Sequence, residues 1–512
     1  MSDTNAAREW HRTSPVAVVF FLFRTARQFA ANGLPAIAVI IAAYASGGTG
    51  RKALMVAGLL LFILISVIAS FLNWLRFRFC ITGDRVLVRS GVLHREELSV
   101  EFGRVQNVNI REPFYMRPFS LAVLAIDTAG SSQKEIFLGG INKDLAVRLR
   151  ETILAGGKEQ TDDPAVEASA SSGPTTLLSR DVKDIIIYGL TVNFILWFVI
   201  AIGAFFGAWD SSEEVLKWLA AKIQLQDVVQ AAENSVGLLG SILLLLGLVL
   251  AVFLLLPLIS VLGALFRHYG YELSVEGETY RKSGGLLTRH DESMKRHKIQ
   301  ALVLKQNFAA LFLKRINMQL RVASAGSGIE SGQLPTGGKA TFLVPALHEP
   351  EVLELAKEFF PACDVAGARF SRVNRRRMTT LVLALITVPV LAVTTSLGLL
   401  LSWKFFAIAP LAYAIAWSAV SRYWKKTGYA VVGEYGFVRH GFIGTETTVF
   451  PLFKVQRVDI RQTPGQRRKG LAHLGIHLAS HSLKIPYVPI EDAEQFRDLS
   501  LYCVESTDRA WY

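Results

Sequence analysis

Three histidines at four-residue spacing form the most metal-like pattern in this chain. On a helix, His473, His477 and His481 would share one face at the ligand spacing of a zinc site. The alternation of apolar and polar residues around them predicts a strand instead, with Gly475 and Ser480 between the histidines. We therefore interpret them as strand histidines that face solvent, and we expect no bound metal.

Two glycine-rich stretches resemble nucleotide-binding loops only superficially. The stretch 332–341 reads Gly-Gln-Leu-Pro-Thr-Gly-Gly-Lys-Ala-Thr and has a glycine where a phosphate loop needs its lysine. The stretch 326–328, Gly-Ser-Gly, lacks the further glycine of a dinucleotide fingerprint, and no Gly-x-Ser-x-Gly elbow occurs. The sequence therefore indicates no catalytic residue and no cofactor, and we expect a protein that is not an enzyme.

A pattern of base, aliphatic, Gln, any residue, aliphatic, any residue, aliphatic, base occurs three times. The glutamines, which serve as repeat anchors, are Gln106, Gln300 and Gln456. A glycine lies fifteen residues before each of them, at Gly91, Gly285 and Gly441. The glutamines have the parity of the aliphatic residues two places on, so we expect buried amides that satisfy backbone groups at a sheet edge.

The base that closes each pattern has the opposite parity and is expected to face out. These three residues are Arg111, Lys305 and Arg461. They are candidate contacts for lipid phosphates or for acidic segments of a partner. A solvated basic face without a ligand is the alternative.

Short stretches around each anchor alternate apolar and polar residues and are broken by Gly, Asp or Pro. This alternation predicts antiparallel β-hairpins that close a small sandwich or partial barrel. A helix that caps the β-structure is expected after each copy, at 142–154, 348–360 and 491–504. The chain is thus expected to hold one small β-domain three times.

The chain is 51% hydrophobic, and six apolar segments account for much of this. They lie at about 29–46, 53–75, 185–209, 236–266, 379–402 and 405–420. A helix crosses a bilayer with about 20 apolar residues, so we expect three transmembrane helix pairs. Lysines and arginines flank each pair on its outer sides, which predicts that both termini and the β-domains are cytoplasmic.

The predicted order alternates the helix pairs with the β-domains. It runs from an N-terminal segment with the first pair (1–75) to β-domain 1 (76–154), a flexible linker (155–180), the second pair (181–267), β-domain 2 (268–361), a basic linker (362–378), the third pair (379–421) and β-domain 3 (422–512).

In this order and in its repeated motif the chain resembles the bacterial family of membrane-flanked pleckstrin-homology-like (PH-like) domains. The shared motif is a glycine followed, fifteen residues later, by the glutamine of [Val/Ile]-Gln-x-[Val/Leu]. A doubled glycine, Gly284 and Gly285, makes the second copy depart slightly from the pattern. The resemblance implies three PH-like β-sandwiches, each capped by a C-terminal helix, at the inner (plasma) membrane. It also implies no catalysis and a role in envelope stress or in resistance to membrane-active peptides.

The leading hypothesis is a multi-pass membrane scaffold whose PH-like domains bind proteins or lipid headgroups. Expected partners are membrane lipids and a membrane or cytoplasmic protein, with a smaller PH-like relative as one candidate; oligomerisation stays open. We attribute the net charge of +13 to acidic lipids and expect no nucleic acid. The alternative is a transporter or lipid-handling protein gated by its domains. Prolines inside the apolar segments favour this alternative, and the near absence of charge there disfavours ion transport.

Overall fold

The structure is a computed structural model. It describes residues 10–18, 70–82, 84–91, 95–128, 136–155, 175–192, 238–322, 341–382, 408–442 and 444–507, with scattered single positions between them. The predicted span 29–46, the glycine-rich stretch 326–328 and most of the stretch 332–341 lie outside these residues.

Within the described residues, the strands form four sheets in which every pairing is antiparallel, as the sequence predicted. The first sheet contains β1 (His11–Arg12), β2 (Arg78–Thr82), β3 (Arg85–Ser90) and β4 (Glu96–Glu101). The second contains β5 (Val105–Pro113), β6 (Leu121–Thr128), β7 (Ile136–Asn142), β8 (Thr175–Ser179), β9 (Glu272–Glu276), β10 (Thr279–Gly284) and β11 (Thr288–Lys295). The third contains β12 (Ile299–Gln306), β13 (Ile316–Val322), β14 (Thr341–Leu347), β15 (Ser371–Arg372), β16 (Gly428–Val432), β17 (Tyr435–His440) and β18 (Thr445–Pro451). The fourth contains β19 (Val455–Arg461), β20 (Leu471–Leu478) and β21 (Ser482–Pro489).

The strands follow from two-residue alternation. In β20, Leu474, Ile476 and Leu478 are buried, whereas His473 and His477 between them are only partly buried. Successive side chains of a strand point to opposite faces, so one face of β20 packs into a core and the other meets polar groups. The histidine pattern therefore lies on a strand, as predicted.

Each copy ends in a helix that caps its sheets. The three capping helices are α3 (Lys143–Ala155), α10 (Glu349–Phe359) and α15 (Ile490–Glu505). In α10 the backbone N–H of His348 donates to Glu351 Oε2 at 2.7 Å, which satisfies a free amide at the helix start. Val352, Leu355 and Phe359 of α10 are buried in the core of the second copy. The prediction of capping helices is confirmed.

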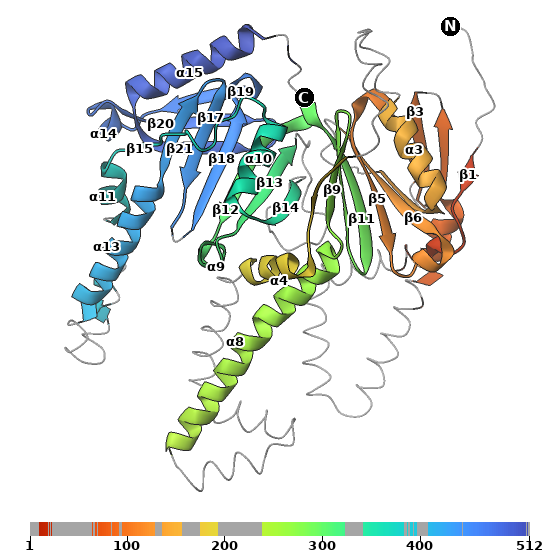
Figure 1. Ribbon diagram of the computed structural model, residues 1–512, viewed down its shortest axis with the longest axis horizontal. Coiled ribbons are helices and arrows are strands. Elements are labelled where there is room, and N and C mark those ends of the chain that lie inside the picture. The colour runs from red at the N-terminus through yellow and green to blue at the C-terminus, as the bar shows by residue number, and fades with distance from the viewer. Residues whose placement is uncertain are drawn as a thin grey trace.

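Each of the two large sheets is built from two consecutive copies. The second sheet has the strand order β7-β6-β5-β11-β10-β9-β8, so the last three strands of copy 1 continue into the first four of copy 2. The third sheet, β14-β13-β12-β18-β17-β16-β15, joins copies 2 and 3 in the same way. Figure 1 shows β5 and β6 of copy 1 beside β9 and β11 of copy 2. We call the β5·β11 pairing the first junction and the β12·β18 pairing the second junction.

The apolar cores cross these boundaries as well. The core of copy 2 includes Ala430, Tyr435, Phe437 and Val449 from copy 3, all of them buried. Conversely, Ala301 of copy 2 belongs to the core of copy 3. Buried apolar area stabilises a fold by roughly 25 cal/mol per Å², so the copies stabilise one another.

The remaining described helices correct the prediction of three transmembrane helix pairs. They are α4 (Val182–Thr191), α8 (Leu238–His268), α9 (Phe308–Phe312), α11 (Arg376–Val382), α13 (Ile408–Lys426) and α14 (Pro464–Arg467). Among the described residues, no helix combines the length and the continuous apolar character that crossing a membrane requires. The predicted alternation with transmembrane pairs is therefore wrong for the part of the chain that the structure describes.

The prediction was wrong because hydropathy identifies apolar segments of the sequence, and the bounds of the helices do not coincide with the bounds of those segments. α4 ends at Thr191, where Val192 has an extended backbone, although the apolar segment runs on to about residue 209. The last turns of α13 carry Arg422, Lys425 and Lys426. α8 runs from Leu238 to His268, with Pro257 inside it and Arg267 and His268 in its last turn.

Candidate functional site

The three bases predicted to bind a partner lie in unequal surroundings. Lys305 Nζ in β12 lies 3.5 Å from Glu446 Oε2 in β18, across the second junction. Arg111 in β5 is the strand partner of His290 in β11, at the first junction. Arg461 ends β19, and its side chain is 77% exposed. The structure thus places two of the three at contacts between copies and leaves the third at the surface.

The first junction is held by buried polar contacts across the two copies. Ser293 Oγ donates to the carbonyl of Val108 at 3.0 Å. The guanidinium of Arg150, on the capping helix of copy 1, forms an ion pair with Asp291 of copy 2 at 3.1 Å. Hydrogen bonds to charged groups and buried ion pairs depend strongly on geometry, so these contacts set the orientation of one copy against the next.

One buried lysine holds the second junction. Lys454 is 5% exposed, and its Nζ donates to the carbonyls of His297 and Ile299 of copy 2 at 2.6 and 2.7 Å. Burial, together with the nearby charge of Lys298, lowers the pKa of Lys454 to about 8. The side chain remains mostly protonated at neutral pH, and it donates to two backbone carbonyls that the strand pairing leaves without a donor.

The glutamine anchors lie in equivalent strands, but the burial of their side chains differs between the copies. Gln300 in β12 is fully buried, whereas Gln456 in β19 is exposed. Gln106 lies in β5, and its side chain is not among those described. The prediction of a buried amide is therefore wrong for the third copy, because no described strand covers β19 on that side.

The glycine anchors lie at equivalent turns, after β3, β10 and β17. Gly91 has a φ of 101° and Gly285 a φ of 120°, values that L-residues with a side chain rarely adopt. A Cβ on Gly441 would lie 2.2 Å from the carbonyl oxygen of Gly444. A left-handed backbone in two copies and a close backbone contact in the third explain why glycine recurs here.

The cross-domain junctions, the turn glycines and the capping helices describe a repeated β-domain, and comparison with known proteins names it. The family described as "Bacterial PH domain" matches residues 29–156, 234–360 and 380–502. The chain belongs to this family. It is also similar to the "UPF0699 transmembrane protein YdbT" of Bacillus subtilis (strain 168), with 24% identity over 97% of this chain and 99% of that relative. This is therefore a YdbT-like protein with three PH domains.

PH domain 3 carries an exposed basic group that we call the basic corner: Arg467, Arg468 and Lys469, on and just after α14. None of the three forms an ion pair with any described carboxylate. α14 is pinned by Gln466, whose Oε1 accepts from the Thr463 backbone N–H at 2.9 Å. Positive charges without acidic neighbours attract anions most strongly at low ionic strength.

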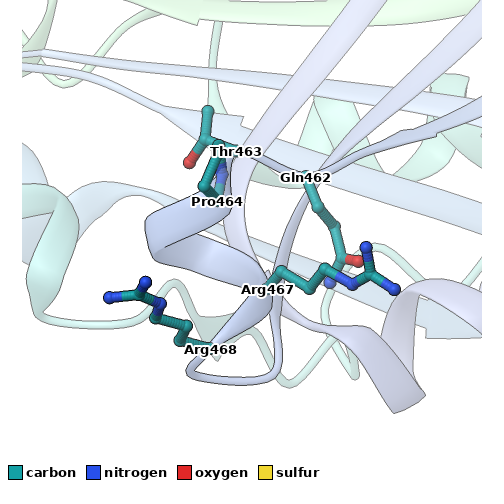
Figure 2. A pocket seen from close by; sticks show the side chains of 5 residues that line it. All are labelled: Gln462, Thr463, Pro464, Arg467 and Arg468. Atoms are coloured by element: carbon teal, nitrogen blue, oxygen red, sulfur yellow. The ribbon is translucent and has the colours of Figure 1, made fainter.

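A shallow hollow of about 450 Å³ lies beside this corner. Its lining residues are Gln462, Thr463, Pro464, Arg467 and Arg468. Figure 2 shows Arg467 extending toward Gln462 and Arg468 leaving α14 on the other side. The hollow offers hydrogen-bond donors and two guanidinium groups to a ligand at the surface of PH domain 3.

The histidines of PH domain 3 have partners within the domain. His473 Nε2 lies 2.8 Å from Gln466 Nε2, and His477 Nε2 lies 3.1 Å from Asp459 Oδ2. His481 lies after β20, beside Ser480. Among the described residues no group of three or more His, Cys, Asp or Glu side chains could hold a metal. The three side chains are partly buried rather than fully exposed to solvent.

Sequence reasoning missed the first strand of each PH domain. β1, β8 and β15 pair with β2, β9 and β16, the first strands inside the predicted β-domains. β8 and β15 fall in the segments predicted as linkers, 155–180 and 362–378. A stretch of two to five residues carries too little alternation to predict a strand. In addition, an apolar segment separates each of these strands from the rest of its PH domain in the sequence, so the sequence did not indicate that the strand belongs to that domain.

Acidification is expected to weaken PH domain 2 through His268, which is 6% exposed and packs edge-on against Tyr188. Burial, then the charges of Lys282 and Arg267, lower the pKa of His268 from 6.5 to about 3; Glu292 opposes this and His290 adds to it. Between these pH values the unfolded chain binds a proton that the folded chain does not, so stability falls as the pH falls.

From pH 7 to pH 5.5, this histidine should cost the local stability of the α8–β9 segment about 1 kcal/mol. Hydrogen exchange of peptides covering 268–276, corrected for the intrinsic pH dependence, measures the loss. His268→Phe keeps an aromatic ring and should remove the part of the pH-dependent loss of stability that His268 causes. An unchanged pH response in the variant would contradict the assignment.

Proposed function

We propose that this YdbT-like protein is a non-catalytic scaffold of the inner (plasma) membrane whose basic corner binds the phosphate groups of acidic lipids. Both termini and the PH domains are placed in the cytoplasm by this proposal. The family and the relative named a transmembrane protein support an association with a membrane. The narrower role in envelope stress or peptide resistance rests on the resemblance alone.

The basic corner is the observation that carries the lipid-binding proposal. Lys305 and Lys454 are committed to contacts at the second junction, and Arg461 pairs with Asp459 of its own strand. Arg467, Arg468 and Lys469 are exposed beside a hollow. Each Lys or Arg near an anionic membrane surface contributes roughly 1 kcal/mol of attraction, so three together make a useful site.

Exposed aromatic residues support membrane contact from a second place. Phe308 and Phe312 of α9 are 48% and 83% exposed. α9 packs beside α4, which in turn packs against α8. Figure 1 shows α9 and α4 at the end of PH domain 2 from which α8 extends. Lys314, just after α9, is exposed as well. Large apolar side chains exposed next to a basic group are typical of surfaces that contact the membrane interface.

The scaffold part of the proposal rests on the shared sheets. Because each junction continues one sheet through two domains, the three PH domains are held in fixed relation to one another. A ligand bound to one domain therefore lies at a defined distance from the surfaces of the other two. This raises the effective concentration of those surfaces for a second contact with the same ligand.

Removing the basic corner is expected to weaken binding of acidic lipid. The test titrates the purified full chain, in a neutral detergent, with fluorescent phosphatidylglycerol and with phosphatidylcholine as the neutral lipid. We expect Arg467→Ser/Arg468→Ser/Lys469→Ser to raise the apparent Kd for phosphatidylglycerol about tenfold, because three attractive charges are lost under partial screening.

The matched control removes the same charge from the three capping helices, as Arg148→Ser/Lys357→Ser/Arg497→Ser. Arg148 and Lys357 are exposed, and the side chain of Arg497 is 42% exposed. The control should bind like the native chain. Equal phosphatidylglycerol affinity in the corner variant and in the control would overturn the lipid-binding proposal. A protein that co-purifies with the native chain but not with the corner variant would instead assign this surface to a protein partner.

A further inference from the structure

The two junctions between PH domains use the same strands in the same register. Counted from the anchor glutamines, the residue two places after one anchor pairs with the residue seven places before the next. This pair is Val108 with Ser293 at the first junction and Leu302 with Val449 at the second. Both pairings are antiparallel. The chain therefore uses one interface twice.

The first and the last PH domain of the chain each leave one strand of this interface without a described partner strand. β4 is an edge of the first sheet and β19 an edge of the last, and no further described strand lies beside either. Ser99 of β4 is exposed, whereas the equivalent Ser293 of β11 is buried. Gln456 of β19 is exposed, whereas the equivalent Gln300 is buried. Unpaired strand edges are templates for pairing with another chain.

The two uncovered strands carry opposite charge. Glu96, Glu97 and Glu101 are exposed on β4, and Arg457 and Arg461 are exposed on β19. The acidic residue of β19, Asp459, lies within ion-pair distance of Arg457, Arg461 and His477 of the same domain. One carboxylate faces two arginines, so β19 keeps a net positive charge. Complementary charge favours encounter and sets the register of an interface.

The register of the internal junctions predicts how these two strands would meet. Carried over, it places Val458 opposite Ser99 and Arg461 opposite Glu96. The second junction has the same combination at the same position, where the Nζ of Lys305 lies 3.5 Å from Glu446 Oε2. A base opposite an acid in neighbouring strands stabilises the pairing by up to about 1 kcal/mol.

We propose that a second copy of this chain docks head to tail, with β19 of one chain adding antiparallel to β4 of the next. The contact is continuous with the junctions inside the chain and repeats their register. The inference goes beyond the lipid-binding function and does not rest on it, since its residues lie on the strands and not on the basic corner.

The alternative is that charge on β4 only protects a sheet edge from aggregation. The equivalent strands argue against this. β11 carries Arg289, Asp291 and Glu292, β18 carries Glu446, and both strands are nevertheless paired inside the array. Charge on this strand therefore selects a complementary partner and does not prevent pairing.

Head-to-tail docking joins two different surfaces, so every added chain leaves the same two edges at its ends. Such an assembly closes into a ring if the rotation per chain permits and otherwise grows as a filament. In either case the PH domains of successive chains form one longer series with the same junction throughout.

A charge exchange tests the pairing. Arg461→Glu and Glu96→Arg should each weaken self-association of the full chain about tenfold, because each places like charges opposite one another. Mass photometry of the chain in detergent measures the species. The double variant Glu96→Arg/Arg461→Glu restores opposite charges and should associate like the native chain. A loss of folding in one variant would not be repaired in this way.

Mixing the two single variants gives a sharper result. Wherever unlike chains meet, the charges at positions 461 and 96 are opposite again, either as in the native chain or exchanged. An equimolar mixture should therefore associate like the native chain, although each variant alone associates weakly. Association that is indifferent to these charges, or a native chain that stays monomeric at the highest concentration measured, overturns the proposal.

Cysteine pairs test the register itself. Oxidation of a mixture of Ser99→Cys and Val458→Cys chains should yield covalent dimers, because the proposed register places these residues opposite one another. Each variant oxidised alone controls for the native cysteines. A mixture of Glu97→Cys and Val458→Cys chains is displaced by two residues and should yield at least about fivefold less dimer. Equal yields from the two mixtures would contradict the register.

Discussion

Replacing Arg180 with methionine is expected to lower the local stability of PH domain 2 by about 3 kcal/mol, because it leaves the partly buried carboxylate of Glu351 without its ion-pair partner. The Arg180 side chain is 3% exposed. It donates to Glu351 Oε2 at 2.6 Å and to Oε1 at 3.1 Å, and it lies 3.4 Å from Asp184. It therefore joins α4 to the capping helix α10.

Hydrogen exchange of peptides from α4 and α10 measures this loss, which corresponds to opening about a hundred times more often. Arg148→Met, on the exposed side of α3, removes the same charge and should leave these peptides unchanged. Arg180→Met combined with Glu351→Gln should recover part of the loss, since the amide oxygen can still accept from the His348 N–H while no charged carboxylate is left without its partner. Exchange in Arg180→Met as slow as in the native chain would show that the contact does not support α10.

Replacing Lys454 with methionine is expected to destabilise the second junction by about 2 kcal/mol. The side chain keeps its length and its packing, but the carbonyls of His297 and Ile299 lose a charged donor. Each buried acceptor without a donor costs about 1–3 kcal/mol. Water that reaches one of the two carbonyls replaces part of the lost hydrogen bonding, so the total is less than twice that cost. The expected consequence is faster exchange of β12 and β18 with little change in β20 and β21.

The control for this prediction is Lys469→Met, which changes an exposed lysine of the same PH domain. It should leave exchange in β12 and β18 as in the native chain. Uniform faster exchange over all of PH domain 3 in Lys454→Met would indicate that the lysine supports the fold of the domain and not the junction. No change at all would remove Lys454 from the junction.

The candidate site was predicted in part. The pattern that selected Arg111, Lys305 and Arg461 treats them as equivalent, and they lie in the equivalent strands β5, β12 and β19. Their surroundings differ, because the second strand beside each comes from the next copy and the third copy has none among the described residues. The basic corner was not predicted, because it lies in a turn between strands that differs in all three copies.

The transmembrane prediction failed for a related reason. Hydropathy is summed along the chain and identifies apolar segments, but it does not show where a helix begins and ends. α4 ends at Thr191, inside a segment that hydropathy continues to about residue 209. At that end the side-chain amide of Asn307, the residue before α9, donates to the carbonyl of Thr191.

By itself the sequence determined the threefold repeat, the turn glycines, the antiparallel strands and the capping helices. These depend on local spacing, on two-residue alternation and on the φ angles that glycine permits, all of which are visible within one copy. Only the tertiary structure decided that consecutive copies share sheets, that Gln300 is buried while Gln456 is exposed, and that Lys454 holds a junction. Pairing at a strand edge depends on which distant strand arrives there, and no spacing within a copy encodes that neighbour.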